Sequence, residues 1–115
     1  MIVAGCIEDR ERPAPPRLSF TFDRTTVRSI NPPAPQDSIS GSIQARDPDG
    51  IDSVWVKVDQ IEAGDDGGLD PSFNRRFSFT VQAGKPPTTQ IPVRFRARDL
   101  AGFEVQRDTY VVVIP

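Results

Sequence analysis

The sequence has no histidine and only one cysteine, Cys6. Without histidine, the residue on which most catalytic triads and many zinc sites depend is missing. Acid–base catalysis by carboxylates would need a desolvated cleft, which a domain of this size on short turns does not obviously offer. A single cysteine excludes an internal disulfide, so packing must hold the fold together. We therefore expect a protein that is not an enzyme and has no catalytic residues.

Basic charge and long apolar runs are also scarce. The formal net charge is −2, whereas a domain that binds nucleic acid is usually basic, so we expect no nucleic-acid partner. No stretch approaches the roughly 20 apolar residues of a membrane-spanning helix. If the protein meets a membrane, we expect a lipid to hold it there. The 115 residues are enough for one domain with one core.

Residues 1–16 differ in composition from the rest of the chain. Val3-Ala4-Gly5-Cys6 resembles the lipobox at which bacterial lipoprotein precursors are cleaved and lipidated. The charged and then proline-rich residues 8–16 are typical of an extended tether. Only a short apolar run and no basic residue precede the cysteine, so a start codon placed too late or an accidental match stays open. We expect a lipid on Cys6 and a folded domain at residues 17–115.

From residue 17 onward, apolar and polar residues alternate with the period of a β-strand, and no window has the period of a helix. The alternation predicts strands at 17–23 (or 17–30), 38–46, 52–59, 75–82, 89–98 and 103–114. The last of these ends apolar on both faces, which predicts a bulge or cover on both sides. Strands of this length and spacing indicate a β-sandwich of about seven antiparallel strands.

Two turns share one pattern. Residues 45–50 and 97–102 both read Ala-Arg-Asp-x-x-Gly, in which the aspartate can cap the turn and the glycine can supply a positive φ. With these turns the chain resembles bacterial immunoglobulin-like domains, a group that includes fibronectin III-like and cadherin-like repeats. The resemblance covers residues 17–115 and implies an immunoglobulin-like sandwich without a disulfide. It implies little about function, because this architecture carries many unrelated roles.

Residues 60–74 are acidic and rich in glycine. We expect them to form a long mobile loop that holds at most one short strand, and the sequence does not assign it a role.

Four aspartates are candidates for a calcium site. Asp47, Asp49 and Asp52 lie in or beside the first Ala-Arg-Asp-x-x-Gly turn, and Asp99 lies in the second, at the same end of the expected sandwich. Calcium takes six to eight oxygen ligands, and clustered aspartates on tight turns can begin such a cage. The alternative is that these aspartates only cap their turns, which needs no metal.

A second candidate site lies on the outer face of the expected sheet. Trp55 is out of phase with its apolar neighbours and should point outward beside Lys57 and a ladder of three arginines. These protein-binding candidates are Trp55, Lys57, Arg94, Arg96 and Arg98. Tryptophan and arginine are enriched in binding hot spots. The alternative is a solvated face on which arginine stems shield the ring, with partners such as Glu104 or Asp59.

We therefore expect a lipid-anchored or secreted domain of the bacterial cell envelope, on its periplasmic or extracellular side. It would act by protein–protein contact, as a structural or accessory subunit of a larger assembly. The alternative is a ligand-binding module for calcium or carbohydrate. Apart from calcium and a lipid on Cys6, we expect no cofactor. The sequence identifies neither the partner nor the oligomeric state.

Overall fold

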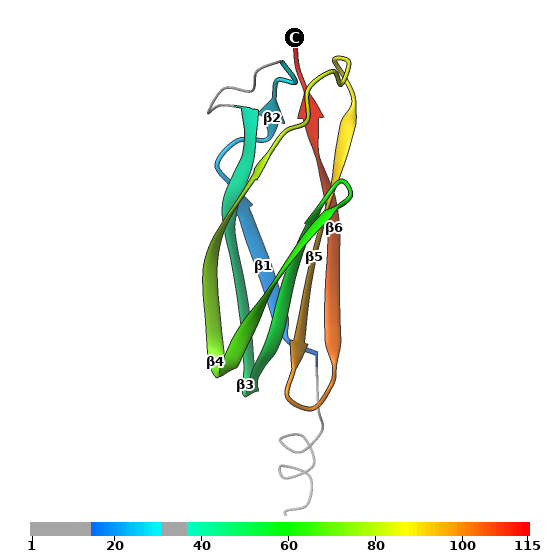
Figure 1. Ribbon diagram of the computed structural model, residues 1–115. Coiled ribbons are helices and arrows are strands. Elements are labelled where there is room, and N and C mark those ends of the chain that lie inside the picture. The colour runs from blue at the N-terminus through cyan, green and yellow to red at the C-terminus, as the bar shows by residue number, and fades with distance from the viewer. Residues whose placement is uncertain (1–14, 31–36) are drawn as a thin grey trace, which may run out of the picture.

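The computed structural model describes residues 15–30 and 37–115, and these residues form one curled sheet of six strands (Figure 1). The strands are β1 (Arg17–Phe22), β2 (Thr26–Val27), β3 (Ser38–Val58), β4 (Ile61–Thr80), β5 (Gln90–Asp99) and β6 (Glu104–Val113). The described part of the chain contains no α-helix. The expectation of an all-β protein is therefore confirmed.

Alternation of buried and exposed side chains explains why these segments form strands. In β5, Ile91, Val93, Phe95 and Ala97 are buried while the residues between them are exposed or half-buried. The second half of β3 repeats this pattern. Folding thus removes the apolar face of each strand from water, which stabilises the fold by about 25 cal/mol per Å² of apolar surface buried.

The strand order in the sheet is β1-β3-β5-β6-β2, and β4 also pairs with β3. All pairs are antiparallel except β2 with β6, which is parallel. The expectation that every strand is antiparallel is wrong for this pair. β2 has two residues and follows β1 after a short link. The chain does not reverse in a hairpin before it reaches β6, so β2 runs parallel to β6.

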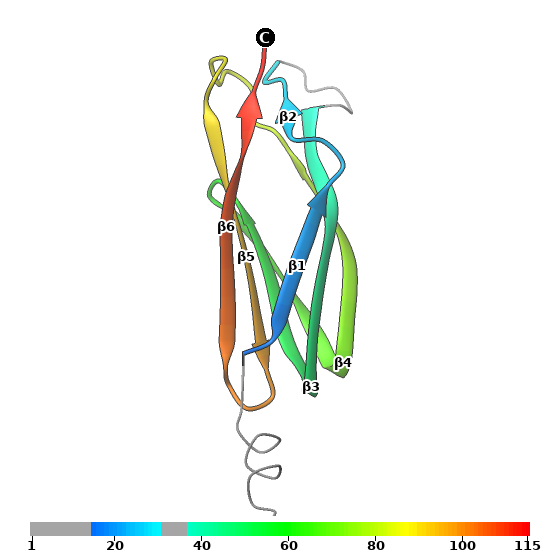
Figure 2. The same cartoon turned by 180° about the vertical axis from the view of Figure 1, so that it is seen from behind.

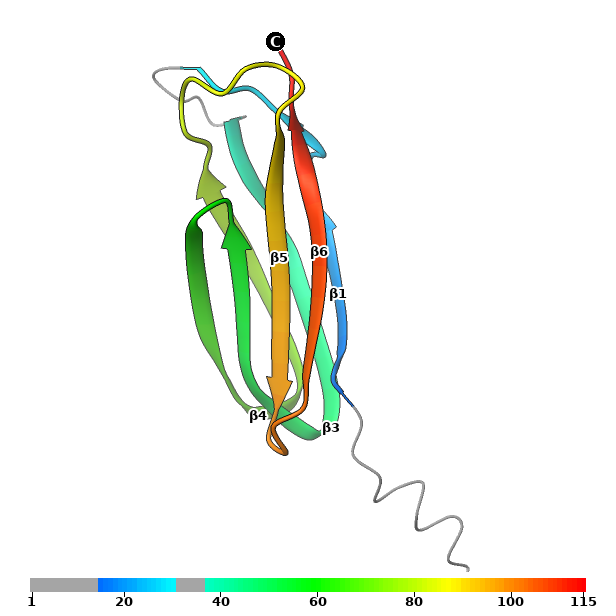
Figure 3. The same cartoon turned by 90° about the vertical axis from the view of Figure 1, so that its right-hand side faces the viewer.

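β3 and β4 each turn back on themselves at a corner. The ladder between them shifts register between Arg46 and Ile51 and again between Ile51 and Ser53. We call residues 47–50 the β3 corner and residues 67–71 the β4 corner. Before its corner β3 pairs with β1, and after it with β5. The two corners lie at the same end of the molecule (Figure 1, Figure 3).

Because of these corners, the two halves of the sheet face one another across the core. The ring of Phe20 from β1 stacks on Phe95 from β5 with centroids 4.2 Å apart, although the two strands are not hydrogen-bonded neighbours. Phe77 from the second half of β4 meets Phe95 edge-on at 5.5 Å. Figure 2, the view from behind, shows β1 between β6 and β3.

The interpretation of residues 60–74 as a mobile loop is wrong. β4 is continuous from Ile61 to Thr80 and pairs with β3 on both sides of the corner. The two residues Asp59 and Gln60 make the connecting turn, with Asp59 at a φ of 57°. The polar, glycine-rich composition reflects an edge strand whose first half is largely exposed on both faces, which resembles a loop in sequence.

The expected bulge in the last strand is also absent from the described β5–β6 ladder, which keeps one register from Gln90–Val112 to Arg98–Glu104. Cover on both faces, the other alternative, is not seen among the described residues either: Val111 and Val113 are buried, whereas Tyr110 is 51% exposed, and β2 pairs with the second edge of β6. The irregularity lies in β3, where the chain turns from one half of the sheet to the other.

The start of β1 and the carboxyl terminus lie at opposite ends of the domain. β1 begins at Arg17 beside the two corners and the β5–β6 turn, whereas the carboxyl terminus lies at the opposite end (Figure 1, Figure 3). We call the first of these the corner end. Cys6 and the proline-rich break near residues 31–35 lie outside the described residues.

Candidate functional site

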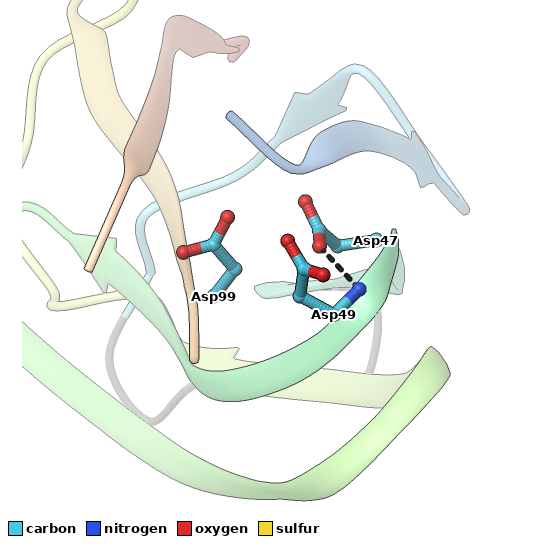
Figure 4. A group of neighbouring side chains, drawn as sticks. All are labelled: Asp47, Asp49 and Asp99. Atoms are coloured by element: carbon cyan, nitrogen blue, oxygen red, sulfur yellow. Dashed lines mark hydrogen bonds between the residues drawn. The ribbon is translucent and has the colours of Figure 1, made fainter. Parts of the chain in front are cut away.

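Three aspartates converge at the corner end (Figure 4). Asp47 and Asp49 come from the β3 corner and Asp99 from the last position of β5. One carboxylate oxygen from each lies within 4.8 Å of the others. We call Asp47, Asp49 and Asp99 the aspartate triad. The triad joins residues about 50 positions apart in the chain. This agrees with the expectation that the two Ala-Arg-Asp-x-x-Gly turns lie at the same end of the domain.

Each turn fixes its own aspartate. The Asp49 backbone N–H donates to Asp47 Oδ1 at 2.8 Å, and the Phe103 N–H donates to Asp99 Oδ1 at 2.8 Å. Gly50 and Gly102 end these turns at φ values of 97° and 92°, a region that favours glycine. The expected capping by aspartate and positive φ of glycine are therefore confirmed.

Capping leaves one buried oxygen without a partner. Asp47 is 5% exposed and Asp99 is 1% exposed. Asp99 Oδ2 is buried and accepts no hydrogen bond from any part of the chain that the structure describes. A buried acceptor without a partner costs about 1–3 kcal/mol, and more if it is charged. Turn capping alone does not account for this oxygen.

The charges of the triad oppose one another. The pKa of Asp47 is raised, first by burial, then by the negative charge of Asp99 and by a side-chain hydrogen bond with Asp99 that favours the protonated form, against the hydrogen bond from the Asp49 N–H. Within residues 15–30 and 37–115, neither arginine nor lysine forms an ion pair with a triad carboxylate. The site therefore lacks a compensating positive charge from the described chain.

The chemistry of the donors restricts which ion the triad could hold. All the converging side-chain atoms are carboxylate oxygens, which suit hard cations such as calcium, magnesium or manganese. The oxygens come from two separate turns, and Asp49 is exposed, so the triad is open on one side. Calcium accepts irregular geometry and keeps water ligands readily, and it fits such an open, asymmetric set best.

Asp52, the fourth predicted ligand, is not part of the triad. Its carboxylate accepts a hydrogen bond from Ser53 Oγ at 3.1 Å and lies 3.6 Å from Arg98 Nε. The shift in register beside Ile51 places Asp52 on the outer face of the sheet with Arg98. Sequence spacing could not reveal this, because the shift depends on pairing with β4 and β5.

The second predicted site lies where expected, on the outer face of β3 and β5. Trp55 is directly opposite Arg96, and Lys57 is opposite Arg94. The Arg96 guanidinium lies over the indole ring, with Cζ 4.5 Å from its centroid. Arg94 and Arg98 are exposed and pair with Asp108 and Asp52.

Two carboxylates hold Arg96 in place over the ring. Glu62 lies 3.4 Å from Arg96 Nη2, and Glu104 lies 3.5 Å from Nη1. Sequence reasoning named Glu104 as a partner and missed Glu62, because Glu62 belongs to the segment interpreted as a loop. No apolar alternation in residues 61–66 marks this strand in the sequence.

No helix in the described residues is long and apolar enough to cross a membrane. No family model matches the chain, and no match was found among curated proteins or solved structures. The functional inference therefore depends on the geometry of the aspartate triad and of the Trp55 face.

Proposed function

We propose that this chain is a non-catalytic immunoglobulin-like domain that binds a calcium ion at its corner end. The observation that carries the proposal is the buried carboxylate of Asp99, whose Oδ2 accepts no hydrogen bond from the described residues and of which one oxygen lies within 4.8 Å of carboxylate oxygens of Asp47 and Asp49. A bound cation would satisfy this oxygen and remove the repulsion between the three side chains.

The strand order supports the immunoglobulin-like interpretation. If β3 and β4 are divided at their corners, one layer contains β1, residues 38–46 and residues 72–80. The other layer contains residues 61–66, residues 51–58, β5, β6 and β2. Two such layers, with the chain passing between them at an edge, are typical of immunoglobulin-like sandwiches.

Calcium affinity would be modest. Three carboxylates supply part of the six to eight oxygens, and water would complete the shell, as in extracellular modules with a Kd of roughly 10⁻⁴–10⁻³ M. At a calcium concentration about ten times Kd, binding to the folded state alone stabilises it by about 1.4 kcal/mol. In a domain of this size that corresponds to a rise in melting temperature of several degrees.

Protein–protein contact through the Trp55 face is the second candidate function. Its support is the pair of Trp55 and Arg96, residue types enriched in hot spots. However, Arg96 already covers the ring and is held by Glu62 and Glu104, so a partner would have to displace an ion-paired cluster. The same cover argues against a stacking platform for carbohydrate. We therefore rank calcium binding first. A lipid on Cys6 and a place in the cell envelope remain part of the proposal.

Thermal unfolding with millimolar calcium or with a chelator tests the calcium site. We expect calcium to raise the melting temperature of the unmodified chain by several degrees. Asp99→Asn keeps the Oδ1 atom that caps Phe103 but removes the charge, and it should abolish the gain. Asp52→Asn is the matched control, since Asp52 lies in the same region outside the triad, and it should keep the gain.

Two results would contradict the proposal. One is a melting temperature in the unmodified chain that calcium does not change. The other is an equal calcium gain in the unmodified chain and in Asp99→Asn. Magnesium at the same concentration provides a further comparison, because it demands near-ideal octahedral geometry and should stabilise the chain less.

A further inference from the structure

Exposed apolar side chains surround the aspartate triad. Leu69 in the β4 corner is 51% exposed, and Leu100 and Phe103 in the β5–β6 turn are 60% and 39% exposed. The Leu100 N–H donates to the Gly50 carbonyl at 3.1 Å, and Phe103 caps Asp99. Leu100 and Phe103 thus belong to the turn that follows Asp99, and Leu69 belongs to the β4 corner, whose backbone lies beside Gly50 of the β3 corner.

Leu69 has a backbone conformation that is unusual for leucine. Its φ is 61°, directly after Gly68 at 66°. An asparagine or a glycine would adopt this conformation at lower cost, and a non-glycine residue there costs about 1 kcal/mol or more. Because half of the side chain is exposed, packing does not explain why a leucine occupies this position.

Two arginines at the same end face one another without a carboxylate. Arg17 of β1 is directly opposite Arg46 of β3 in the antiparallel ladder, and both are exposed. Within the part of the chain that the structure describes, neither forms an ion pair. Like charges directly opposite one another on a sheet destabilise it. Such a pair suits the oxygens of a phosphate, which accept bidentate bonds from guanidinium groups.

We propose that the corner end adsorbs to an anionic lipid surface in a calcium-dependent manner. Arg17 and Arg46 bind lipid phosphates, while Leu69, Leu100 and Phe103 enter the interface between headgroups and acyl chains. This inference rests on the proposed calcium site. Without the ion the triad would repel anionic lipids, and with it the repulsion is removed.

The arrangement fits a lipid surface better than a protein partner. The three apolar side chains come from two turns beside a polar site, and they are too few for the apolar core of a protein interface of about 800 Å² per partner. The folded domain also begins at this end, eleven residues after Cys6. A lipid on that cysteine would keep the corner end within about 40 Å of the membrane.

Co-sedimentation of the whole reduced chain with lipid vesicles tests the proposal. We expect binding to phosphatidylcholine vesicles that contain phosphatidylglycerol in the presence of calcium. Binding should be at least about tenfold weaker with phosphatidylcholine alone, because the arginines then have no anionic surface to bind, and with a chelator, because the triad then repels the anionic lipids. Asp99→Asn should lose the calcium effect.

Surface variants separate the corner end from the rest of the molecule. The double variant Leu100→Ser/Phe103→Ser should bind about tenfold more weakly, since it removes two of the three apolar side chains that enter the interface. The double variant Arg17→Gln/Arg46→Gln should bind the vesicles more weakly to a similar extent. Ile61→Ser/Ile114→Ser, which changes exposed residues at the opposite end, is the matched control and should bind like the unmodified chain.

The lipid proposal and the calcium site can fail separately. A calcium gain in melting temperature without calcium-dependent sedimentation overturns the lipid proposal and leaves the calcium site intact. Equal sedimentation of the Leu100→Ser/Phe103→Ser variant and the unmodified chain overturns the lipid proposal as well. If calcium changes neither the melting temperature nor sedimentation, both proposals are wrong.

Discussion

The indole ring of Trp55 lies directly against Gly64 on the neighbouring strand. The two residues are register partners of β3 and β4, and a Cβ added to Gly64 would stand 2.8 Å from Trp55 Cδ1. Since Arg96 lies over the same ring, the indole is enclosed by a glycine and a guanidinium. The glycine therefore makes room for a tryptophan on the outer face of the sheet.

Replacing this glycine should disturb the ring. Gly64→Val would normally favour a strand, but here it should lower the free energy of unfolding by about 1–2 kcal/mol, as overpacking does. The fluorescence of the single tryptophan should change with it. Ala63→Val, one position away, is the control and should leave both quantities nearly unchanged. A Gly64→Val protein as stable as the unmodified chain would show that the ring is free to move.

Arg96 should contribute more to stability than the other arginines of its face. It contacts the Trp55 ring and two carboxylates, whereas Arg94 has only one exposed ion pair, with Asp108. Chemical denaturation should show a loss of about 1–2 kcal/mol for Arg96→Ala and about 0.5 kcal/mol or less for Arg94→Ala. Equal losses would mean that the cluster over Trp55 is not a stabilising unit.

Removing the charge of Asp47 should stabilise the calcium-free protein at neutral pH. Burial and the Asp99 charge raise the pKa of Asp47 above its ordinary value of 3.8. A raised carboxyl pKa favours the folded state below the unfolded pKa, and this contribution is lost as the pH rises through the folded pKa. Asp47→Asn keeps the acceptor for the Asp49 N–H, so its melting temperature in chelator should exceed that of the unmodified chain near pH 7. The difference between the two melting temperatures should vanish near pH 3. Calcium should no longer raise the melting temperature of Asp47→Asn. A lower melting temperature for Asp47→Asn near pH 7 would contradict the repulsion inferred within the triad.

Asp23 should titrate with a pKa of about 2, well below its ordinary value of 3.8. Hydrogen bonds from Arg76 and then from Ser40 stabilise its charged form. Its contribution to stability is therefore present above pH 3.8 and is lost as the pH falls toward 2. Titration followed by NMR should give a higher Asp23 pKa in Arg76→Ala and a smaller rise in Ser40→Ala. A larger rise in Ser40→Ala would reverse this order of causes.

The β3 corner should depend on Gly50. Its φ is 97°, and a Cβ there would lie 2.5 Å from the Leu69 carbonyl oxygen. Gly50→Ala should therefore destabilise the protein by about 2–3 kcal/mol. Gly102→Ala has a similar φ of 92° with no atom within 4 Å of the added Cβ, so it measures the conformational cost alone and should lose less. If both variants lose the same free energy, the close approach of the two corners does not matter for stability.

Strand identity was predictable where one face is buried. The alternation in β5 and in residues 38–46 directly reports burial of every second side chain. It failed for residues 61–70, where β4 is an edge strand and most side chains are exposed. There, backbone pairing with β3 makes the strand, and no apolar period marks it in the sequence.

The candidate site was predictable to a similar extent. The two Ala-Arg-Asp-x-x-Gly turns indicated Asp47, Asp49 and Asp99, because turn chemistry is local and their common end follows from the strand order. Asp52 was wrongly included in the predicted ligand set, since the bulge beside Ile51 turns it toward Arg98. The apolar residues around the triad were not predicted, because exposure of Leu69, Leu100 and Phe103 depends on which turns meet in space.

The sequence by itself therefore determined an all-β chain, the outward direction of Trp55 and the turns that carry the triad, since each follows from local period or turn chemistry. Only the tertiary structure decided that β3 and β4 turn at corners at the same end and that the buried carboxylate of Asp99 lies beside those of Asp47 and Asp49. It also decided that Arg96 is held over Trp55 by Glu62 and Glu104. These relationships join residues far apart in the chain, and they exist only once two strands have paired and curled around one core.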